Sequence, residues 1–168
     1  NWDIPTFDTT SFSSKIKIEL SNNVRINDVI EGDFVLYGKP EIKINVPNQK
    51  GLVIEDKSTY KIVWDSKNIR ENRVNLYYSD NSGSKWKPIA IDISNKGYYD
   101  WIIPSLKTID CIFKVESSIQ PEIYSVSKFS IKITEKPLII IENNLNNQMY
   151  SAFDSLDINW QSYNLSNK

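Results

Sequence analysis

The chain repeats itself with a period near 96 residues, and this repeat limits the folds that are open to it. Four residues of one motif recur without a gap: Ile62, Trp64, Ser66 and Asn68 reappear as Ile158, Trp160, Ser162 and Asn164 (160 − 64 = 96). A period of this length is typical of one β-sandwich domain, whereas solenoid and propeller units repeat every roughly 20 to 50 residues. The sequence therefore predicts several copies of one β-sandwich in tandem.

A second alignment covers the beginning of the chain. Trp2 and Pro5 resemble Trp101 and Pro104 at an offset of 99, and the apolar residues that follow fit an offset of 95. These apolar pairs are Ile16 with Cys111, Ile18 with Phe113, Leu20 with Val115, Phe34 with Phe129 and Leu36 with Ile131. The two offsets imply about four additional residues (99 − 95) in the first copy, in the polar stretch from Asp8 to Ser14.

These alignments divide the chain into three parts. We expect residues 1–39 to be the C-terminal half of a first β-sandwich repeat, residues 40–136 a complete repeat, and residues 137–168 the N-terminal half of a third. The chain does not begin with Met and stops within a motif, so we expect a fragment of a larger protein. Either the rest of that protein completes the half-repeats, which we favour, or residues 137–168 of one chain meet residues 1–39 of the next in a head-to-tail filament.

Alternating apolar and polar residues predict seven short strands in the complete repeat, and no segment has a convincing helical pattern. The expected strands are residues 41–46, 59–64, 73–78, 85–91, 97–101, 110–116 and 127–133. Gly83 and Gly97 fit the turns between them, because tight turns need positive φ. This spacing predicts an all-β fold, a two-sheet antiparallel sandwich of immunoglobulin or fibronectin type III kind.

The junctions between repeats are short and contain proline. Lys39-Pro40 and Lys136-Pro137 lead directly into the next strand, and neither junction has a Gly/Ser tract that would form a flexible coil. Proline restricts the backbone at both places. We therefore expect a string of such repeats to be a semi-rigid rod.

Composition argues against several classes of function. The chain has no histidine, which removes the commonest general base and zinc ligand, and one cysteine, Cys111, which cannot form an internal disulfide. Because Cys111 aligns with Ile16, we expect a buried apolar position rather than a reactive thiol. The net charge is −1 and the apolar runs are short, so we expect no nucleic-acid partner and no membrane insertion. We expect no cofactor and no catalytic or metal-binding residues.

The segment from Ser79 to Trp86 resembles the Asp box, a hairpin motif of sialidases and related propellers. Asn81 stands where that motif has Asp, and Lys85 stands where it has Thr. A propeller would repeat about every 40 to 50 residues, which is half the period found here. We therefore expect a structural hairpin in which Trp86 packs on the core.

The complete repeat contains an ordered series of aromatic, glycine and apolar motifs. They lie at Tyr60 to Trp64, Val74 to Ser79, Gly83 to Trp86, Gly97 to Pro104, Cys111 to Val115 and Ser127 to Ile131. In this order they resemble the tandem immunoglobulin-like repeats of very large secreted and surface proteins of bacteria. They are also similar to the Ser-Thr-rich, lipid-anchored cell-wall protein domain of yeasts. The resemblance implies a spacer, adhesin or matrix role and supplies no catalytic residues.

Aromatic residues have two interpretations. We expect Trp64, Trp86, Trp101 and Trp160, together with Cys111, to form the structural core. Alternation turns Tyr77 and one of Tyr98 and Tyr99 outward, and exposed aromatic rings can stack on sugars. These tyrosines are the candidate glycan contacts of an alternative function, a carbohydrate-binding or accessory module of a secreted enzyme.

Carboxylates are scattered, and no pair has the spacing of an acid and a base. A calcium ion at a junction stays an alternative, with Glu41, Glu135 and Asp56 as ligands, although Lys39 and Lys136 lie nearby in sequence. Thr9 and Ser155 follow aspartate, as in the O-glycosylation sites of some exported bacterial proteins.

Together these features predict a non-catalytic spacer repeat of a large exported cell-surface protein, adhesin or extracellular fibre. Its expected partners are neighbouring repeats of the same protein or neighbouring chains in a fibre, with surface glycans or other surface proteins as further candidates. A domain of an enzyme whose active site lies elsewhere is a second alternative.

Overall fold

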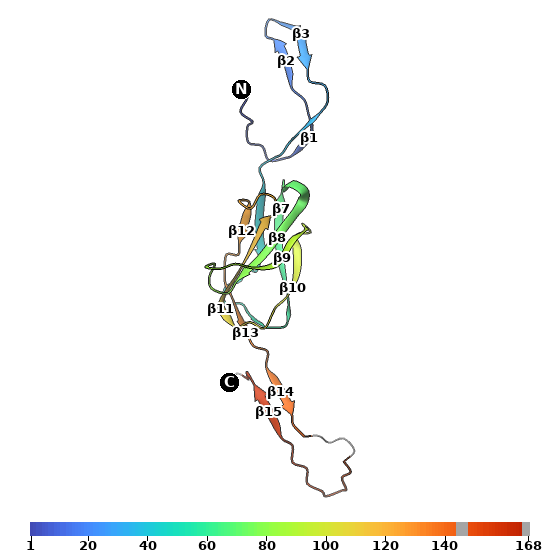
Figure 1. The fold of residues 1–168 in the computed structure, drawn as a ribbon, viewed down its shortest axis with the longest axis vertical. Helices are drawn as coiled ribbons and strands as arrows, with labels where there is room; N and C mark the ends of the chain where they lie inside the picture. Colours follow the sequence, from blue (N-terminus) through green and yellow to red (C-terminus); the bar gives the residue numbers. More distant parts are fainter. Residues whose placement is uncertain (144–147, 166–168) are drawn as a thin grey trace.

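A computed structural model describes residues 1–143 and 148–165, and Figure 1 shows three parts that follow one another along the long axis of the molecule. The chain is almost entirely β. Within the described residues, the one helical element is a short 3-10 turn, Arg70–Asn72. The prediction of an all-β chain is confirmed.

The middle part, residues 40–136, is called the central module here. Its strands are β5 (Glu41–Val46), β6 (Val53–Glu55), β7 (Thr59–Lys67), β8 (Arg73–Ser79), β9 (Lys87–Ser94), β10 (Tyr98–Ile102), β11 (Thr108–Ser117), β12 (Tyr124–Val126) and β13 (Ile131–Thr134). Three of them form one sheet in the order β10-β7-β5. The other six form a second sheet in the order β6-β13-β11-β8-β9, with β12 paired to β11. Pairing in both sheets is antiparallel, except that β6 and β13 are parallel.

The core lies between these two sheets, because alternate residues of the facing strands are large and apolar. Phe113 of β11 is fully buried, and its ring centroid lies 5.4 Å from that of Trp101 and 6.2 Å from that of Tyr60, both in the opposite sheet. The buried apolar residues are Ile42, Ile62, Trp64, Val74, Leu76, Trp101, Ile103, Cys111, Phe113, Val115, Ile131 and Ile133. Both sheets contribute to this set, so the central module buries one continuous core.

Four of the seven expected strands, 41–46, 73–78, 97–101 and 110–116, agree with the observed limits within two residues. The expected strand 59–64 stops three residues before the end of β7, and the expected strand 85–91 begins two residues before β9 and stops three residues before its end. The short strands β6 and β12 were not expected, because three residues are too few to show alternation. The predicted strand 127–133 is interrupted before β13. Ser127 lies buried at this break, where its hydroxyl accepts the N–H of Phe113 at 3.1 Å.

Both expected glycine turns are present. Gly83 has φ +91° and Gly97 has φ +80°, both in the region that favours glycine. Gly97 also approaches β7 closely, because its carbonyl accepts the N–H of Trp64 at 2.9 Å. A Cβ atom at Gly97 would lie 3.2 Å from the carbonyl oxygen of Trp64.

The N-terminal segment, residues 1–39, forms two small strand pairs. Its strands are β1 (Ser11–Ser14), β2 (Lys17–Leu20), β3 (Asn23–Val29) and β4 (Phe34–Leu36). Lys17 pairs with Val29 between β2 and β3, and Lys114 pairs with Val126 between β11 and β12. Both members of the second pair stand 97 residues after those of the first (114 − 17 and 126 − 29).

The C-terminal segment, residues 137–143 and 148–165, contains one antiparallel pair, β14 (Leu138–Ile141) with β15 (Trp160–Tyr163). Ile141 pairs with Trp160 there, and Ile44 pairs with Trp64 between β5 and β7. The two pairs are separated by 97 residues on the first strand and by 96 on the second (141 − 44 and 160 − 64). Both flanking segments leave apolar side chains exposed, because no second layer covers them within the described residues.

We predict that Phe113→Ala lowers the free energy of unfolding of the central module by about 3 to 5 kcal/mol, because it removes the ring that joins the two sheets. Chemical denaturation followed by tryptophan fluorescence measures the change. Ile102→Ala is the control, since Ile102 is 73% exposed and its replacement should change stability by no more than about 0.5 kcal/mol. Equal effects of the two substitutions would contradict this assignment of the core.

Candidate functional site

The three candidate glycan-contact tyrosines lie on two different sheets. Tyr77 belongs to β8 of the larger sheet, whereas Tyr98 and Tyr99 belong to β10 of the smaller one. Tyr98 is 46% exposed, and Tyr99 packs against the core. The structure does not bring these rings together into one flat surface.

A neighbouring lysine, Lys114, covers the ring of Tyr77 on the outer face of its sheet. The Nζ atom of Lys114 lies 4.6 Å from the ring centroid of Tyr77 and 5.3 Å from that of Trp86, and it forms an ion pair with Glu116 at 2.7 Å. Burial, together with a hydrogen bond to Glu116, raises the pKa of the Tyr77 hydroxyl. The charges of Lys114 and Glu116 are therefore paired with each other within this group of side chains.

The expected core residues are only partly in a core. Trp64, Trp101 and Cys111 are buried in the central module. Trp86 is half-buried on the outer face beside Lys114, because the turn before it changes the direction of the chain. Trp160 is 61% exposed, because no second sheet covers β14 and β15 within the described residues.

The segment that resembles an Asp box forms a turn held by two polar side chains. The hydroxyl of Ser79 accepts the N–H of Gly83 at 2.9 Å and donates to Oδ1 of Asn81 at 2.8 Å. The same oxygen of Asn81 accepts the N–H of Lys85 at 2.9 Å. Every one of these bonds lies within the turn, so the motif is structural, as expected.

Carboxylates do not assemble into a metal site in the described part of the chain, where no group of three or more potential ligands is close enough to hold an ion. The proposed calcium ligand Asp56 is 2% exposed and accepts the backbone N–H of Lys136 at 2.9 Å and the hydroxyl of Ser105 at 3.4 Å. Its carboxylate therefore stabilises the chain where the C-terminal segment begins.

The candidate O-glycosylation residues are both on the surface. Thr9 is exposed and lies in the N-terminal segment next to the central module, and Ser155 is exposed in the C-terminal segment. Thr9 also lines a hollow of about 490 Å³ at the boundary with the central module, opposite Ser66, Lys67 and Asn72.

An asparagine with three side-chain hydrogen bonds lies at this same boundary. Asn68 follows β7, and its Nδ2 atom donates to the carbonyl oxygens of Asp8 at 2.7 Å and Lys39 at 2.8 Å. Its Oδ1 atom accepts the hydroxyl proton of Thr10 at 2.8 Å. The Thr10 oxygen accepts in turn the N–H of Gly38 at 3.2 Å. One side chain therefore joins the central module to the segment that precedes it.

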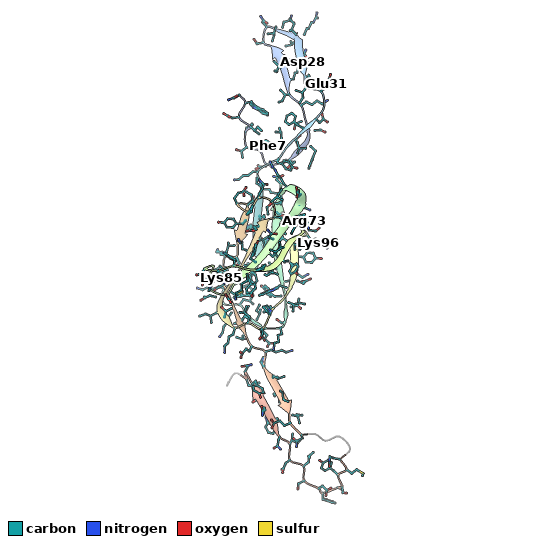
Figure 2. All side chains as sticks on the ribbon, viewed as in Figure 1. Phe7, Asp28, Glu31, Arg73, Lys85 and Lys96 are labelled. Carbon is teal, nitrogen blue, oxygen red and sulfur yellow. The ribbon has the colours of Figure 1, made fainter. Side chains whose placement is uncertain are left out.

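Two further contacts support this junction. The guanidinium carbon of Arg70 lies 4.7 Å from the ring centroid of Tyr37, which is within the range of a cation–π interaction. The N–H of Lys39 donates to the carbonyl of Phe7 at 2.7 Å. Phe7 is labelled in Figure 2 between the hairpin of β2 and β3 and the central module.

Sequence reasoning identified Asn68 as part of the repeated motif but not as a junction residue. An asparagine after a strand is a common turn former, so its type alone did not single it out. The signal that was available is its recurrence as Asn164 at the corresponding place.

No protein-family model matches the chain, and a comparison with curated proteins finds no match. No helix in the described residues is long and apolar enough to cross a membrane.

We predict that Ser79→Ala destabilises the central module by about 1 to 3 kcal/mol, because it leaves the N–H of Gly83 without its acceptor. Denaturant unfolding measures the loss. Ser84→Ala, at an exposed position of the same turn, is the matched control. Asn81→Asp should stay close to the unsubstituted protein, because it retains the oxygen that accepts from Lys85; a loss as large as that of Ser79→Ala would contradict this account.

Burial raises the pKa of the Cys111 thiol from 9.0 to about 12. The unfolded chain therefore loses this proton at lower pH than the folded chain, so the contribution of Cys111 to stability is complete below pH 9 and falls between pH 9 and pH 12. We predict that a maleimide or disulfide reagent at pH 8 leaves the folded protein unlabelled and labels it fully in denaturant. Stoichiometric labelling of the folded protein at pH 8 would contradict this.

Proposed function

We propose that this chain is a non-catalytic spacer from a large exported surface protein, adhesin or extracellular fibre, built from tandem immunoglobulin-like β-sandwich repeats. The observation that carries this proposal is the coincidence of strand register at a separation of 97 residues. Residues 1–39, 40–136 and 137–168 would then be the C-terminal half, the whole and the N-terminal half of successive repeats.

The N-terminal segment supports this period in detail. Ser11 pairs with Leu36 between β1 and β4, as Thr108 pairs with Ile133 between β11 and β13. Both pairs contain a register shift at the same place, between Ser11 and Ser14 and between Thr108 and Cys111. Beyond the shift, Ser14 pairs with Phe34 and Cys111 pairs with Ile131, so all four corresponding positions differ by 97.

Further contacts recur at the same separation. The ion pair Lys17–Glu19 at 2.5 Å corresponds to Lys114–Glu116 at 2.7 Å. The hydrogen bond from the N–H of Ile30 to the carbonyl of Ile16 corresponds to that from Ser127 to Phe113. These contacts favour an offset of 97 over the offset of 95 taken from the apolar residues alone, and they pair Cys111 with Ser14 rather than with Ile16.

The exposed apolar faces of the flanking segments are a second support. Ile139 is 59% exposed on β14, and its counterpart Ile42 is 7% exposed in the central module. Ile18 is 74% exposed on β2, and its counterpart Val115 is fully buried. A residue that is buried in one copy and bare in another is expected when a copy lacks its second layer. In a longer chain, the rest of each repeat would supply that layer.

The end-to-end arrangement in Figure 1 suits a spacer rather than a binding module. The first segment enters the central module at one end and the last segment leaves at the other. The polypeptide therefore gains length with every repeat. The candidate glycan-contact tyrosines lie on separate sheets, so no observation specifically favours the carbohydrate-binding alternative.

We predict that inserting a second copy of residues 40–136 after Lys136 lengthens the molecule by one folded module. The new junction, Lys136-Pro40, would match the two natural Lys-Pro junctions. Small-angle X-ray scattering should show a maximum dimension greater by about 33 Å, since the longest strand has ten residues at about 3.3 Å each.

An insert of Gly and Ser residues of equal length is the control for this experiment. It should give a broad distribution of sizes, because such a sequence behaves as a random coil. A duplicated chain that folds back on itself, with no gain in maximum dimension, would refute the spacer proposal.

A further inference from the structure

At each module boundary of this chain, the asparagine that follows the tryptophan strand has an unusual backbone conformation. Asn68 has φ +55° and Asn164 has φ +56°. Both directly follow the strand that carries the tryptophan of the repeated motif. Left-handed φ is uncommon for residues other than glycine, although asparagine tolerates it better than most.

We propose that Asn68 is a latch that fixes the orientation of the N-terminal segment on the central module, and that Asn164 holds the same place in the next copy. This inference rests on the proposed tandem-repeat spacer and explains how such a spacer would resist bending.

All three side-chain hydrogen bonds of Asn68 cross the boundary between the central module and the N-terminal segment. A carboxamide has two N–H donors and one acceptor oxygen, arranged in one plane. In Asn68, both donors reach carbonyl oxygens of the N-terminal segment, one at Asp8 and one at Lys39, its last residue. The oxygen accepts from Thr10, again in the N-terminal segment. Three hydrogen bonds in fixed directions leave the carboxamide little freedom to rotate. They therefore also hold the three partner residues in place relative to β7.

The close packing around Gly38 restricts this junction further. A Cβ atom at Gly38 would lie 2.7 Å from Nδ2 of Asn68, and 2.9 Å from the carbonyl carbons of Asp8 and Thr9. The chain at Gly38 therefore passes against the backbone of Asp8 and Thr9, within the N-terminal segment, without room for a side chain. Asn68 holds these two stretches, which are already in contact with each other.

The second boundary has the same elements in a looser form. The Nδ2 atom of Asn164 lies 3.5 Å from the carbonyl oxygen of Lys136, which stands 97 residues after Lys39. Glu135 takes the place of Gly38 there. The N–H of Lys136 donates to the buried Asp56 of the central module, whereas the N–H of Lys39 donates to the carbonyl of Phe7. Ser105, which stands 97 residues after Asp8, lines the same hollow as Asn164.

An asparagine that only stabilised its own turn would bond within the turn, as Asn81 does. Asn68 bonds instead to residues 29, 58 and 60 positions away in sequence. A role in the turn alone therefore leaves its side-chain contacts unexplained, whereas a role in module orientation accounts for all three.

The test measures the distance between the two parts directly. Spin labels are placed at Glu31→Cys, in the loop between β3 and β4, and at Lys96→Cys in the central module, two exposed positions that are labelled in Figure 2. Cys111 is fully buried, so it does not take up label in the folded protein. Pulsed electron–electron double resonance then gives the distribution of distances between the two spin labels in the complete 168-residue chain.

Asn68→Gly is the decisive substitution, because glycine adopts the left-handed backbone without strain and removes only the side-chain bonds. We expect the width of the distance distribution at least to double, while the unfolding midpoint of the central module changes little. Asn68→Asp should broaden it as well, because it replaces both donors with an oxygen that faces two carbonyl groups. Thr10→Val weakens the latch from the other side without altering the central module.

Asn48→Gly, at an exposed position outside the junction, is the matched control and should leave the distribution narrow. A narrow distribution in Asn68→Gly and Thr10→Val would overturn the latch and leave the spacer proposal standing. A broad distribution in the unsubstituted chain would overturn the stiffness of the junction itself, whatever the outcome of the module-insertion experiment.

Discussion

Phe113 is the side chain at which the two sheets of the central module meet. Its ring packs on Tyr60 and Trp101 of the opposite sheet, and Trp101 packs in turn on Tyr78, with ring centroids 5.0 Å apart. A β-sheet with an apolar face must bury that face against another layer, and here large rings fill the space between the layers. The strand registers and turns all serve to keep these alternate residues on the inner faces.

The same constraint explains which parts of the fold could be predicted from the sequence. Alternation in β7 and β11 is long enough to reveal both the strands and their buried faces. Trp86 was misplaced because Ser82 and Gly83 have positive φ in the preceding turn, and a pattern of alternation cannot be carried through such a turn. The offset of 95 failed for a related reason. A shift of two residues leaves every side chain on the same face of a strand, so apolar patterns cannot distinguish 95 from 97, whereas hydrogen-bonded register can.

The junction was harder to foresee because it depends on polar side chains that bond to backbone groups. Such residues look alike in a sequence. Asn81 closes its own turn, and Asn95 accepts the indole N–H of Trp64 at 2.8 Å. Asn68 joins two segments through the same carboxamide chemistry. The type of residue gives its capacity for hydrogen bonds, but only the three-dimensional arrangement decides whether its partners lie in the same turn or in another segment of the chain.

The contrast between polar junction and apolar core has a mechanical consequence. Each hydrogen bond at the junction contributes about 1 kcal/mol net, since water competes for the same groups, and the exposed contact of Arg70 with Tyr37 adds about 0.5 to 1 kcal/mol. Removing one large core side chain such as Phe113 costs about 3 to 5 kcal/mol, about as much as these junction contacts together, and the core buries eleven further apolar residues. A lateral load would therefore open a junction before it disturbs the core of a module. Bending would be reversible, because the segments on either side would keep their folds while the bonds of Asn68 break and form again.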